Sequence, residues 1–143
     1  MTKRILLVDD EQSMLFFMGE NLAELGEEYE IDTAGSGEEA LHKFTIQPFD
    51  LVVSDLRMPG IDGITLLQTI RQTNQNTHLI LMTAYGSDRV EVAARRLQLH
   101  SYITKPFRVE DLLDAVRAAL VQNAESTSSS NSQPIIQDSI NGN

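Results

Sequence analysis

The 143 residues suit a single domain, and the 41% of them that are apolar suffice for a hydrophobic core. Cysteine is absent, which excludes disulfides, thiolate nucleophiles and cysteinyl metal sites, and His42, His78 and His100 lack the spacing of paired metal ligands, so each suits a structural role. The net charge of −10 and the absence of any apolar run near ~20 residues argue against nucleic acid and membrane binding, and we expect a cytoplasmic location.

Short strand-forming runs alternate with helical patterns along residues 1–123, which we expect to form the folded domain. Residues 124–143 are rich in Ser, Asn and Gln and read as a disordered polar tail or linker. The strands are predicted from runs that are apolar or rich in β-branched residues, at Ile5–Val8, Tyr29–Thr33, Leu51–Ser54, Leu79–Thr83 and Tyr102–Thr104.

A helical pattern follows each of these strands. Gly26 stands where the first helix would need a C-terminal cap, and Ser36 with Glu39 forms a capping box that predicts the start of the second helix. The apolar positions that predict the helices are Leu15, Met18, Leu22 and Leu25; Ala40, Leu41 and Phe44; Ile64, Leu67 and Ile70; Val90, Ala93, Ala94 and Leu97; and Val109, Leu112, Leu113, Val116 and Leu120.

The alternation predicts an α/β fold built on an open five-stranded parallel sheet. The first, third and fourth strands are continuously apolar, as expected for strands covered on both faces, whereas the second is mixed and the fifth is short, so both belong at edges. Right-handed crossovers then give the strand order 2-1-3-4-5 with helices on both faces.

Reactive side chains follow the strands of this sheet where each strand ends. Asp9 and Asp10 follow the first strand, Asp55 the third, Thr83 ends the fourth, and Lys105 follows the fifth. Ligands bind beyond the carboxyl ends of parallel strands near the point where strand order reverses, so we expect these five residues to line one pocket.

The residue types in this pocket indicate phosphoryl transfer onto Asp55. Two carboxylates ~4 Å apart repel by about 4 kcal/mol at an effective dielectric of ~20, so the cluster needs a cation, and oxygen ligands without Cys or His favour Mg²⁺. Lys105 can pair with Asp55 or hold a phosphoryl oxygen, and Thr83 offers a hydroxyl donor. The alternative is a solvated acidic rim with a helix cap.

The sequence resembles the response-regulator receiver domains of two-component signalling, over roughly residues 3 to 122. The resemblance is carried by four motifs in order, Leu-Leu-Val-Asp-Asp-Glu at 6–11, Asp-Leu-Arg-Met-Pro-Gly-Ile-Asp-Gly at 55–63, Met-Thr-Ala-Tyr-Gly at 82–86 and Thr-Lys-Pro-Phe at 104–107. The last two are similar in wording to receivers of the nitrogen-regulation type. The resemblance implies a flavodoxin-like fold and a signalling role without enzymatic turnover.

The same resemblance implies a role for each residue of the pocket. Asp55 would accept the phosphoryl group from a sensor histidine kinase or phosphotransfer protein. Asp10 would bind Mg²⁺ directly, Asp9 through water, and Asp55 and the Arg57 backbone carbonyl would complete the metal site. The output would be a downstream protein partner or an output domain outside this sequence.

Three further residues have implied roles beside that site. Thr83 and Lys105 would hold the phosphoryl oxygens, with the Lys105–Pro106 bond cis, as is common in receivers. Tyr102 matches the switch aromatic of the family, although a half-buried aromatic on an edge strand is an alternative interpretation. Where receivers usually have Gly-Ala ahead of that aromatic, this chain has Gln98 and Leu99, and we expect the turn there to change.

Two other functions compete with this interpretation. A dinucleotide-binding fingerprint is matched by Gly-Ser-Gly-Glu-Glu-Ala at 35–40. This segment follows an edge strand, however, and the capping box accounts for the same residues. A Mg²⁺-dependent phosphohydrolase with an aspartyl intermediate would need a second acid–base group and a substrate cleft, neither of which is evident from the sequence.

Overall fold

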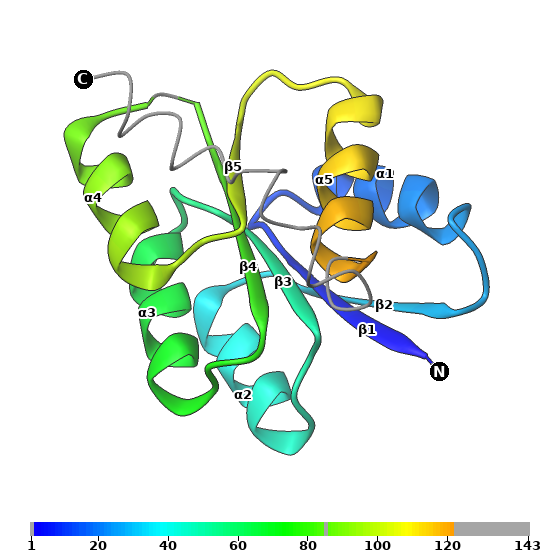
Figure 1. Ribbon diagram of the computed structural model, residues 1–143, viewed down its shortest axis with the longest axis horizontal. Helices are drawn as coiled ribbons and strands as arrows, with labels where there is room; N and C mark the ends of the chain where they lie inside the picture. The colour runs from blue at the N-terminus through cyan, green and yellow to red at the C-terminus, as the bar shows by residue number, and fades with distance from the viewer. Residues whose placement is uncertain (1, 85, 122–143) are drawn as a thin grey trace.

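The computed structural model describes residues 2–84 and 86–121, which form alternating strands and helices (Figure 1). The five strands make one parallel sheet in the order β2-β1-β3-β4-β5, which confirms the predicted fold class and topology. Their bounds are β1 Lys3–Val8, β2 Tyr29–Ala34, β3 Leu51–Asp55, β4 His78–Thr83 and β5 Ser101–Thr104. The tail predicted for residues 124–143 lies outside the described residues.

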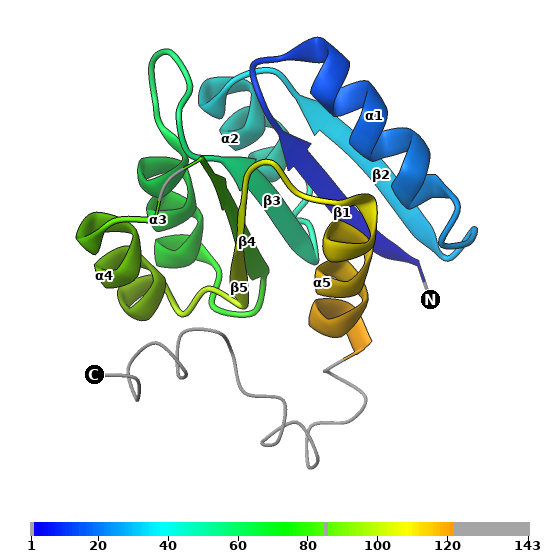
Figure 2. The same cartoon turned by 90° about the horizontal axis from the view of Figure 1, so that it is seen from above.

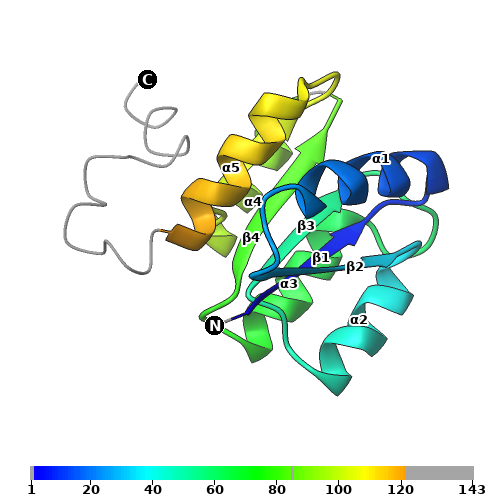
Figure 3. The same cartoon turned by 90° about the vertical axis from the view of Figure 1, so that its right-hand side faces the viewer.

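Five helices cover the two faces of the sheet. They are α1 Gln12–Ala23, α2 Gly37–Ile46, α3 Gly63–Thr73, α4 Asp88–Leu97 and α5 Val109–Val121. Helices α1 and α5 pack on one face, and α2, α3 and α4 pack on the other (Figures 2 and 3). The described part of the chain is therefore a three-layer α/β unit.

The sheet separates two hydrophobic cores because successive side chains of a strand point to opposite faces. In β1, Ile5 and Leu7 join the core under α1 and α5, whereas Leu6 and Val8 join the core under α2, α3 and α4. All four side chains are fully buried. Continuous apolar runs in the central strands thus reflect burial on both faces, as predicted.

The helix ends agree with the sequence patterns at one place and differ at another. The Ser36 hydroxyl accepts a hydrogen bond from the Glu39 amide at 3.0 Å, which confirms the predicted cap of α2. The prediction of Gly26 as the cap of α1 is wrong, because the helix ends at Ala23 and Glu24 is its cap. Gly26 instead has a φ of +137° in the turn that follows.

A second turn departs from expectation between α4 and β5. Gln98 caps α4 with φ 54° and ψ 51°, the left-handed conformation that favours glycine. The turn therefore keeps the backbone that a glycine would adopt, although a glutamine stands there. Leu99 then turns inward and is 2% exposed, in the core under α4.

The buried Arg71 at the end of α3 binds backbone carbonyls near the amino ends of the strands. Its Nε donates to the Leu97 carbonyl at 2.8 Å, and its Nη1 donates to the Thr77 carbonyl at 2.8 Å. Its Nη2 donates to the Gln98 carbonyl at 3.3 Å. Burial lowers the pKa of Arg71. One side chain thus ties α3, the segment before β4 and the end of α4 together.

Candidate functional site

The carboxyl ends of the strands bring the predicted residues together. Ligand atoms of Asp9, Asp10 and Asp55 all lie within 4.8 Å of one another. Parallel register produces this meeting, since the neighbours across the strands near this edge are Val8 and Ser54, Asp55 and Met82, and Thr83 and Thr104. The predicted convergence is confirmed for these three carboxylates.

Lys105 lies among these carboxylates as their cation. Its Nζ is 3.0 Å from Asp55 Oδ1 and 3.5 Å from Asp9 Oδ2. Its backbone amide donates to the Thr83 carbonyl at 2.8 Å, which fixes the start of the lysine side chain beside β4. The Lys105–Pro106 peptide bond is cis, as the resemblance implies.

The electrostatics of the cluster are unbalanced. Burial raises the pKa of the Asp55 carboxyl above its usual range and the charges of Asp9 and Asp10 raise it further, against the hydrogen bond from Lys105. Burial alone would lower the pKa of Lys105, but Asp55 and Asp9 outweigh it and raise that pKa. One lysine therefore faces three carboxylates and does not neutralise them.

The donor set fits a hard divalent cation. Asp9 is fully buried, and while its Oδ1 accepts a hydrogen bond from the Glu11 amide at 2.9 Å, its Oδ2 accepts none from any described residue. This oxygen has a long ion pair with Lys105 at 3.5 Å and no hydrogen bond among the described residues. Beside two more carboxylates, one of them on the exposed Asp10, it suits a hydrated ion with oxygen ligands.

A close approach of α3 to β3 shapes the loop beyond Asp55. The Gly63 amide donates to the Leu56 carbonyl at 2.8 Å. A Cβ atom at position 63 would lie 2.3 Å from the Asp55 carbonyl oxygen, which only glycine avoids. The loop between them also has Gly60 at a φ of +78°. The carboxyl end of β3 is thus positioned by backbone packing.

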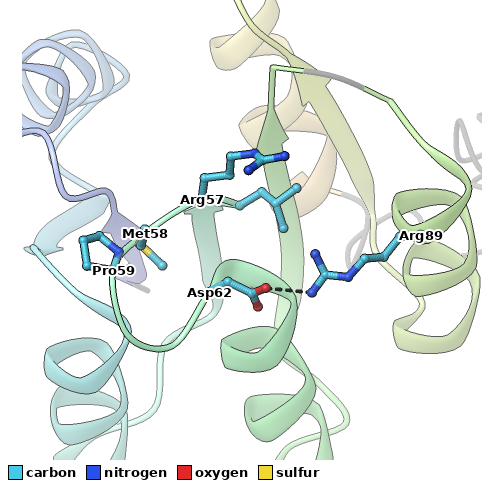
Figure 4. A pocket seen from close by; sticks show the side chains of 6 residues that line it. Arg57, Met58, Pro59, Asp62 and Arg89 are labelled. Carbon is cyan, nitrogen blue, oxygen red and sulfur yellow. Dashed lines mark hydrogen bonds and ion pairs between the residues drawn. The ribbon is translucent and has the colours of Figure 1, made fainter.

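This loop and the first turn of α4 enclose a pocket of about 420 Å³, lined by Leu56, Arg57, Met58, Pro59, Asp62 and Arg89 (Figure 4). Arg89 reaches across it, and its Nη2 lies 2.7 Å from Asp62 Oδ2. Asp62 also caps α3, because its Oδ1 accepts from the Thr65 amide at 2.8 Å. Burial would raise the pKa of Asp62, but bonds from Arg89 and Thr65 hold it below its usual range.

Thr83 and Tyr102 lie on the two strands at the α4 side of the site. Thr83 ends β4 and is 2% exposed. Tyr102 lies on the edge strand β5, half-buried against the core under α4, and its hydroxyl donates a hydrogen bond to Glu91 on α4. The position of Tyr102 agrees with both interpretations given from the sequence.

Sequence reasoning missed the partners on α4. Arg89 and Glu91 stand two residues apart in the first turn of that helix and bind Asp62 and Tyr102, respectively. Charged residues in a helical first turn are ordinary, so their spacing carries no signal. Arg57, by contrast, lies exposed just beyond β3, where the motif places it.

A second pocket of about 540 Å³ opens on the other side of Lys105. It is lined by Glu11, Met14, Phe17, Ala84, Lys105, Pro106 and Phe107. Phe17 is 42% exposed there although it is apolar. Helix α1 itself carries one acidic residue, Glu20, and no Lys or Arg. An exposed aromatic side chain thus borders the carboxylate cluster.

The fingerprint at 35–40 does not lie at the point where strand order reverses, because β2 is an edge strand and the reversal falls between β1 and β3. The Gly35 amide donates to the Glu39 carboxylate at 2.8 Å, so this amide is already satisfied within the segment. Within residues 2–84 and 86–121, none of the helices is long and apolar enough to cross a bilayer.

Comparison with known proteins gives consistent results. The family model described as "Response regulator receiver domain" matches residues 5–117. The transcriptional regulatory protein GlrR of Escherichia coli (strain K12) is 38% identical over 123 residues, which make up 86% of this chain and 27% of that protein. The response regulator ArlR of Staphylococcus aureus (strain Mu50) is 37% identical over 117 residues, or 82% of this chain and 52% of that protein.

Solved structures share the fold. The response regulator receiver domain protein (CheY-like) from Methanospirillum hungatei JF-1 superposes with a TM-score of 0.82 at 28% identity, covering 88% of this chain and 99% of that one. The chain spans about a quarter of GlrR and about half of ArlR. The similarity is therefore to one part of these longer proteins and to nearly all of the solved receiver.

Proposed function

Because this chain belongs to the response regulator receiver domain family of two-component systems, we propose that it accepts a phosphoryl group on Asp55 in a Mg²⁺-dependent reaction and thereby switches partner binding. The donor is a sensor histidine kinase or a phosphotransfer protein. The observation that carries the proposal is the meeting of Asp9, Asp10 and Asp55 around Lys105 at one sheet edge. The chain acts as a signalling domain and not as an enzyme with turnover.

The transfer needs only positioning and charge compensation. A carboxylate oxygen of Asp55 forms a bond to phosphorus while the bond from phosphorus to the donor imidazole nitrogen breaks, and that nitrogen keeps the bonding electron pair. Lys105, now 3.0 Å from Asp55, moves its ammonium to a phosphoryl oxygen, and the Thr83 hydroxyl donates to another. Of the two groups, Lys105 already contacts Asp55, and Thr83 ends the neighbouring strand β4.

The proposed metal ligands are those that the likeness to the receiver family implies. Asp10 and Asp55 would hold Mg²⁺ directly together with the Arg57 carbonyl, and Asp9 would hold it through water. Bound there, the ion offsets negative charge on the carboxylates and the incoming phosphoryl oxygens. The buried Asp9 Oδ2 supports a cation at this place, since it accepts no hydrogen bond from the described residues and lies 3.5 Å from Lys105.

The switch is proposed to run from Thr83 to Tyr102. Movement of the buried Thr83 hydroxyl toward a phosphoryl group frees space beside β4, and the half-buried Tyr102 ring shifts into it. The surface that changes is made by α4, β5 and α5. A protein partner or an output domain reads that surface, and neither nucleic acid nor a membrane binds this acidic segment directly.

The donor protein is proposed to dock on the pocket around Phe17 and Phe107. This pocket includes Lys105, so a partner seated there reaches the acceptor. The exposed Phe16 and Phe17 of α1 favour a donor that makes an apolar contact there. Such a signalling reaction is expected in the cytoplasm.

The test is labelling by a small phosphodonor. With Mg²⁺ and acetyl phosphate, we expect the wild-type chain to gain the mass of one phosphoryl group, and Asp55→Asn to gain none. Chelation of Mg²⁺ should abolish labelling of the wild type. Labelling of Asp55→Asn at the wild-type level would contradict the assignment, and continuous release of phosphate at a high rate would instead indicate a phosphohydrolase.

A further inference from the structure

Ser54 is a polar residue inside an apolar layer, directly before the acceptor. It is fully buried, and β3 is paired on both sides there, with Val8 of β1 and Leu81 of β4 as its neighbours. Val8 and Leu81 are also fully buried and belong to the core under α2, α3 and α4. A hydroxyl buried among apolar side chains costs stability unless it makes a hydrogen bond. The hydroxyl of Ser54 is therefore explained by its hydrogen bond and not by packing.

That hydrogen bond fixes one side of the peptide group that joins Asp55 to Leu56. The Ser54 Oγ donates to the Asp55 carbonyl oxygen at 2.9 Å. On the other side of the same peptide group, the Leu56 amide donates to the Met82 carbonyl of β4 at 2.8 Å. Because the peptide group is planar, these two hydrogen bonds together resist its rotation. The bond to Met82 joins two main chains, whereas the bond from Ser54 depends on one side chain.

The next peptide group along the chain is also fixed. The Leu56 carbonyl accepts a hydrogen bond from the Gly63 amide at 2.8 Å, so the main chain is held at two successive peptide groups after the acceptor. The Arg57 carbonyl follows them directly. One short stretch of main chain therefore sets the direction of both the Asp55 carboxylate and the Arg57 carbonyl, which are proposed ligands of the same ion. A rotation of the first peptide group would change both directions at once.

We propose that Ser54 is a positioning residue for the phosphoryl transfer, because its hydroxyl holds the peptide group after Asp55 so that the acceptor carboxylate and the Arg57 carbonyl meet at one ion. Ser54 contacts neither the ion nor the phosphoryl group and acts only through the main chain. The inference rests on the proposed function and names the side chain that sets the geometry of its site. Metal binding and labelling should both depend on this hydroxyl.

Two variants of similar shape separate the hydroxyl from the volume of the side chain. Ser54→Thr keeps the hydroxyl, whereas Ser54→Val has a methyl group in its place. With acetyl phosphate and saturating Mg²⁺, Ser54→Val should be labelled on the order of tenfold more slowly than the wild type, and its dissociation constant for Mg²⁺, measured by calorimetry, should rise about tenfold. Ser54→Thr should stay close to the wild type in both. Ser54→Ala also lacks the hydroxyl and replaces Ser54→Val if that variant fails to fold.

Thr77→Val is the matched control at the amino edge of the sheet. Thr77 is 3% exposed, and its hydroxyl donates to the Phe49 carbonyl at 2.9 Å. The variant thus loses a buried hydrogen bond of the same kind away from the acceptor. Its Tm in chelator should fall, while its dissociation constant for Mg²⁺ and its labelling rate should equal those of the wild type. A purely structural role of Ser54 would give this same pattern in Ser54→Val.

Two results would overturn the positioning role. Equal slowing in Ser54→Thr and Ser54→Val would mean that packing matters and the hydroxyl does not. Wild-type labelling and Mg²⁺ affinity in both Ser54→Val and Ser54→Ala would mean that the peptide group needs no such bond. If the wild type is not labelled on Asp55, the proposed function fails, while Mg²⁺ titration of the same variants still decides whether Ser54 positions the ligands. A wild type that neither is labelled nor binds Mg²⁺ would overturn both.

Discussion

Two cations at opposite edges of the sheet, Lys105 and Arg71, are bound in contrasting ways. Lys105 at the carboxyl edge contacts two carboxylates, Asp55 and Asp9, with a third nearby, and its side chain is 21% exposed. Arg71 at the amino edge contacts only backbone carbonyls and is 9% exposed. Lys105 faces more negative charges than it can neutralise, whereas Arg71 has neutral partners that the fold holds in place.

The difference distinguishes a chemical role at the carboxyl edge of the sheet from a structural role at the amino edge. The carboxylates that contact Lys105 change their charge when they bind a metal or a phosphoryl group. The contacts of Lys105 are therefore exchangeable. The main-chain carbonyl groups that Arg71 contacts undergo no such change of charge, so the role of Arg71 is structural. The following predictions test that contrast, beginning with the largest effect.

Removal of the Arg71 guanidinium should cost the most stability. Arg71→Met leaves several buried carbonyls without a donor, and we expect a loss of about 3 kcal/mol in the free energy of unfolding. The loss should be the same with Mg²⁺ or with chelator, as measured by urea denaturation. Recovery of the lost stability on addition of Mg²⁺ would contradict the difference proposed between the two edges of the sheet.

Mg²⁺ should stabilise the chain through the carboxyl edge. At 100 times its dissociation constant the gain is about 2.7 kcal/mol, because the folded cluster binds the ion and the unfolded chain does not. Asp10→Ala should lose most of the metal-dependent rise in Tm. An unchanged rise in that variant would place the ion elsewhere.

The Lys105 substitution should have a smaller effect that depends on the metal. Lys105→Met removes the cation from among the carboxylates, and with chelator we expect a loss of about 1 kcal/mol after solvent screening. Because no ammonium then competes for Asp55, the variant should gain more from Mg²⁺ than the wild type does. Thermal melts with and without the ion measure the difference.

The smallest effect concerns pH. The pKa of Asp55 is raised above 3.8 in the folded chain, so the folded chain binds this proton more tightly than the unfolded chain. Its contribution to stability therefore falls as pH rises from the unfolded to the folded pKa. In chelator, Asp55→Asn should gain stability relative to wild type over that rise, and a constant difference across pH would contradict the raised pKa.

The sequence predicts the fold and the acceptor pocket well, for a physical reason. Apolar runs report burial on both faces, and the residue after each strand is carried to one edge by parallel pairing, so Asp9, Asp55 and Lys105 could be placed together before any coordinates. Their roles in phosphoryl transfer stay predictions.

The contacts around α4 could not be predicted. Arg71 binds carbonyls 26 and 27 residues away, and every residue has a carbonyl, so no side-chain pattern marks the pairing. The left-handed backbone of Gln98 was missed for a related reason, since glutamine gives no turn signal. Gly26 is a typical turn residue, but it predicted the wrong end for α1, because the helix ends at Ala23.

The glycine that lets α3 approach the acceptor strand has a consequence for mutational tolerance. Any side chain at position 63 would clash with the Asp55 carbonyl oxygen at 2.3 Å, whereas a Cβ atom at Gly19 would have no neighbour within 4 Å. In a saturation mutagenesis screen for signalling, position 63 should be depleted as strongly as Asp55, although it touches no reacting atom. Gly19 should accept alanine, and substitution there should raise the helical propensity of α1.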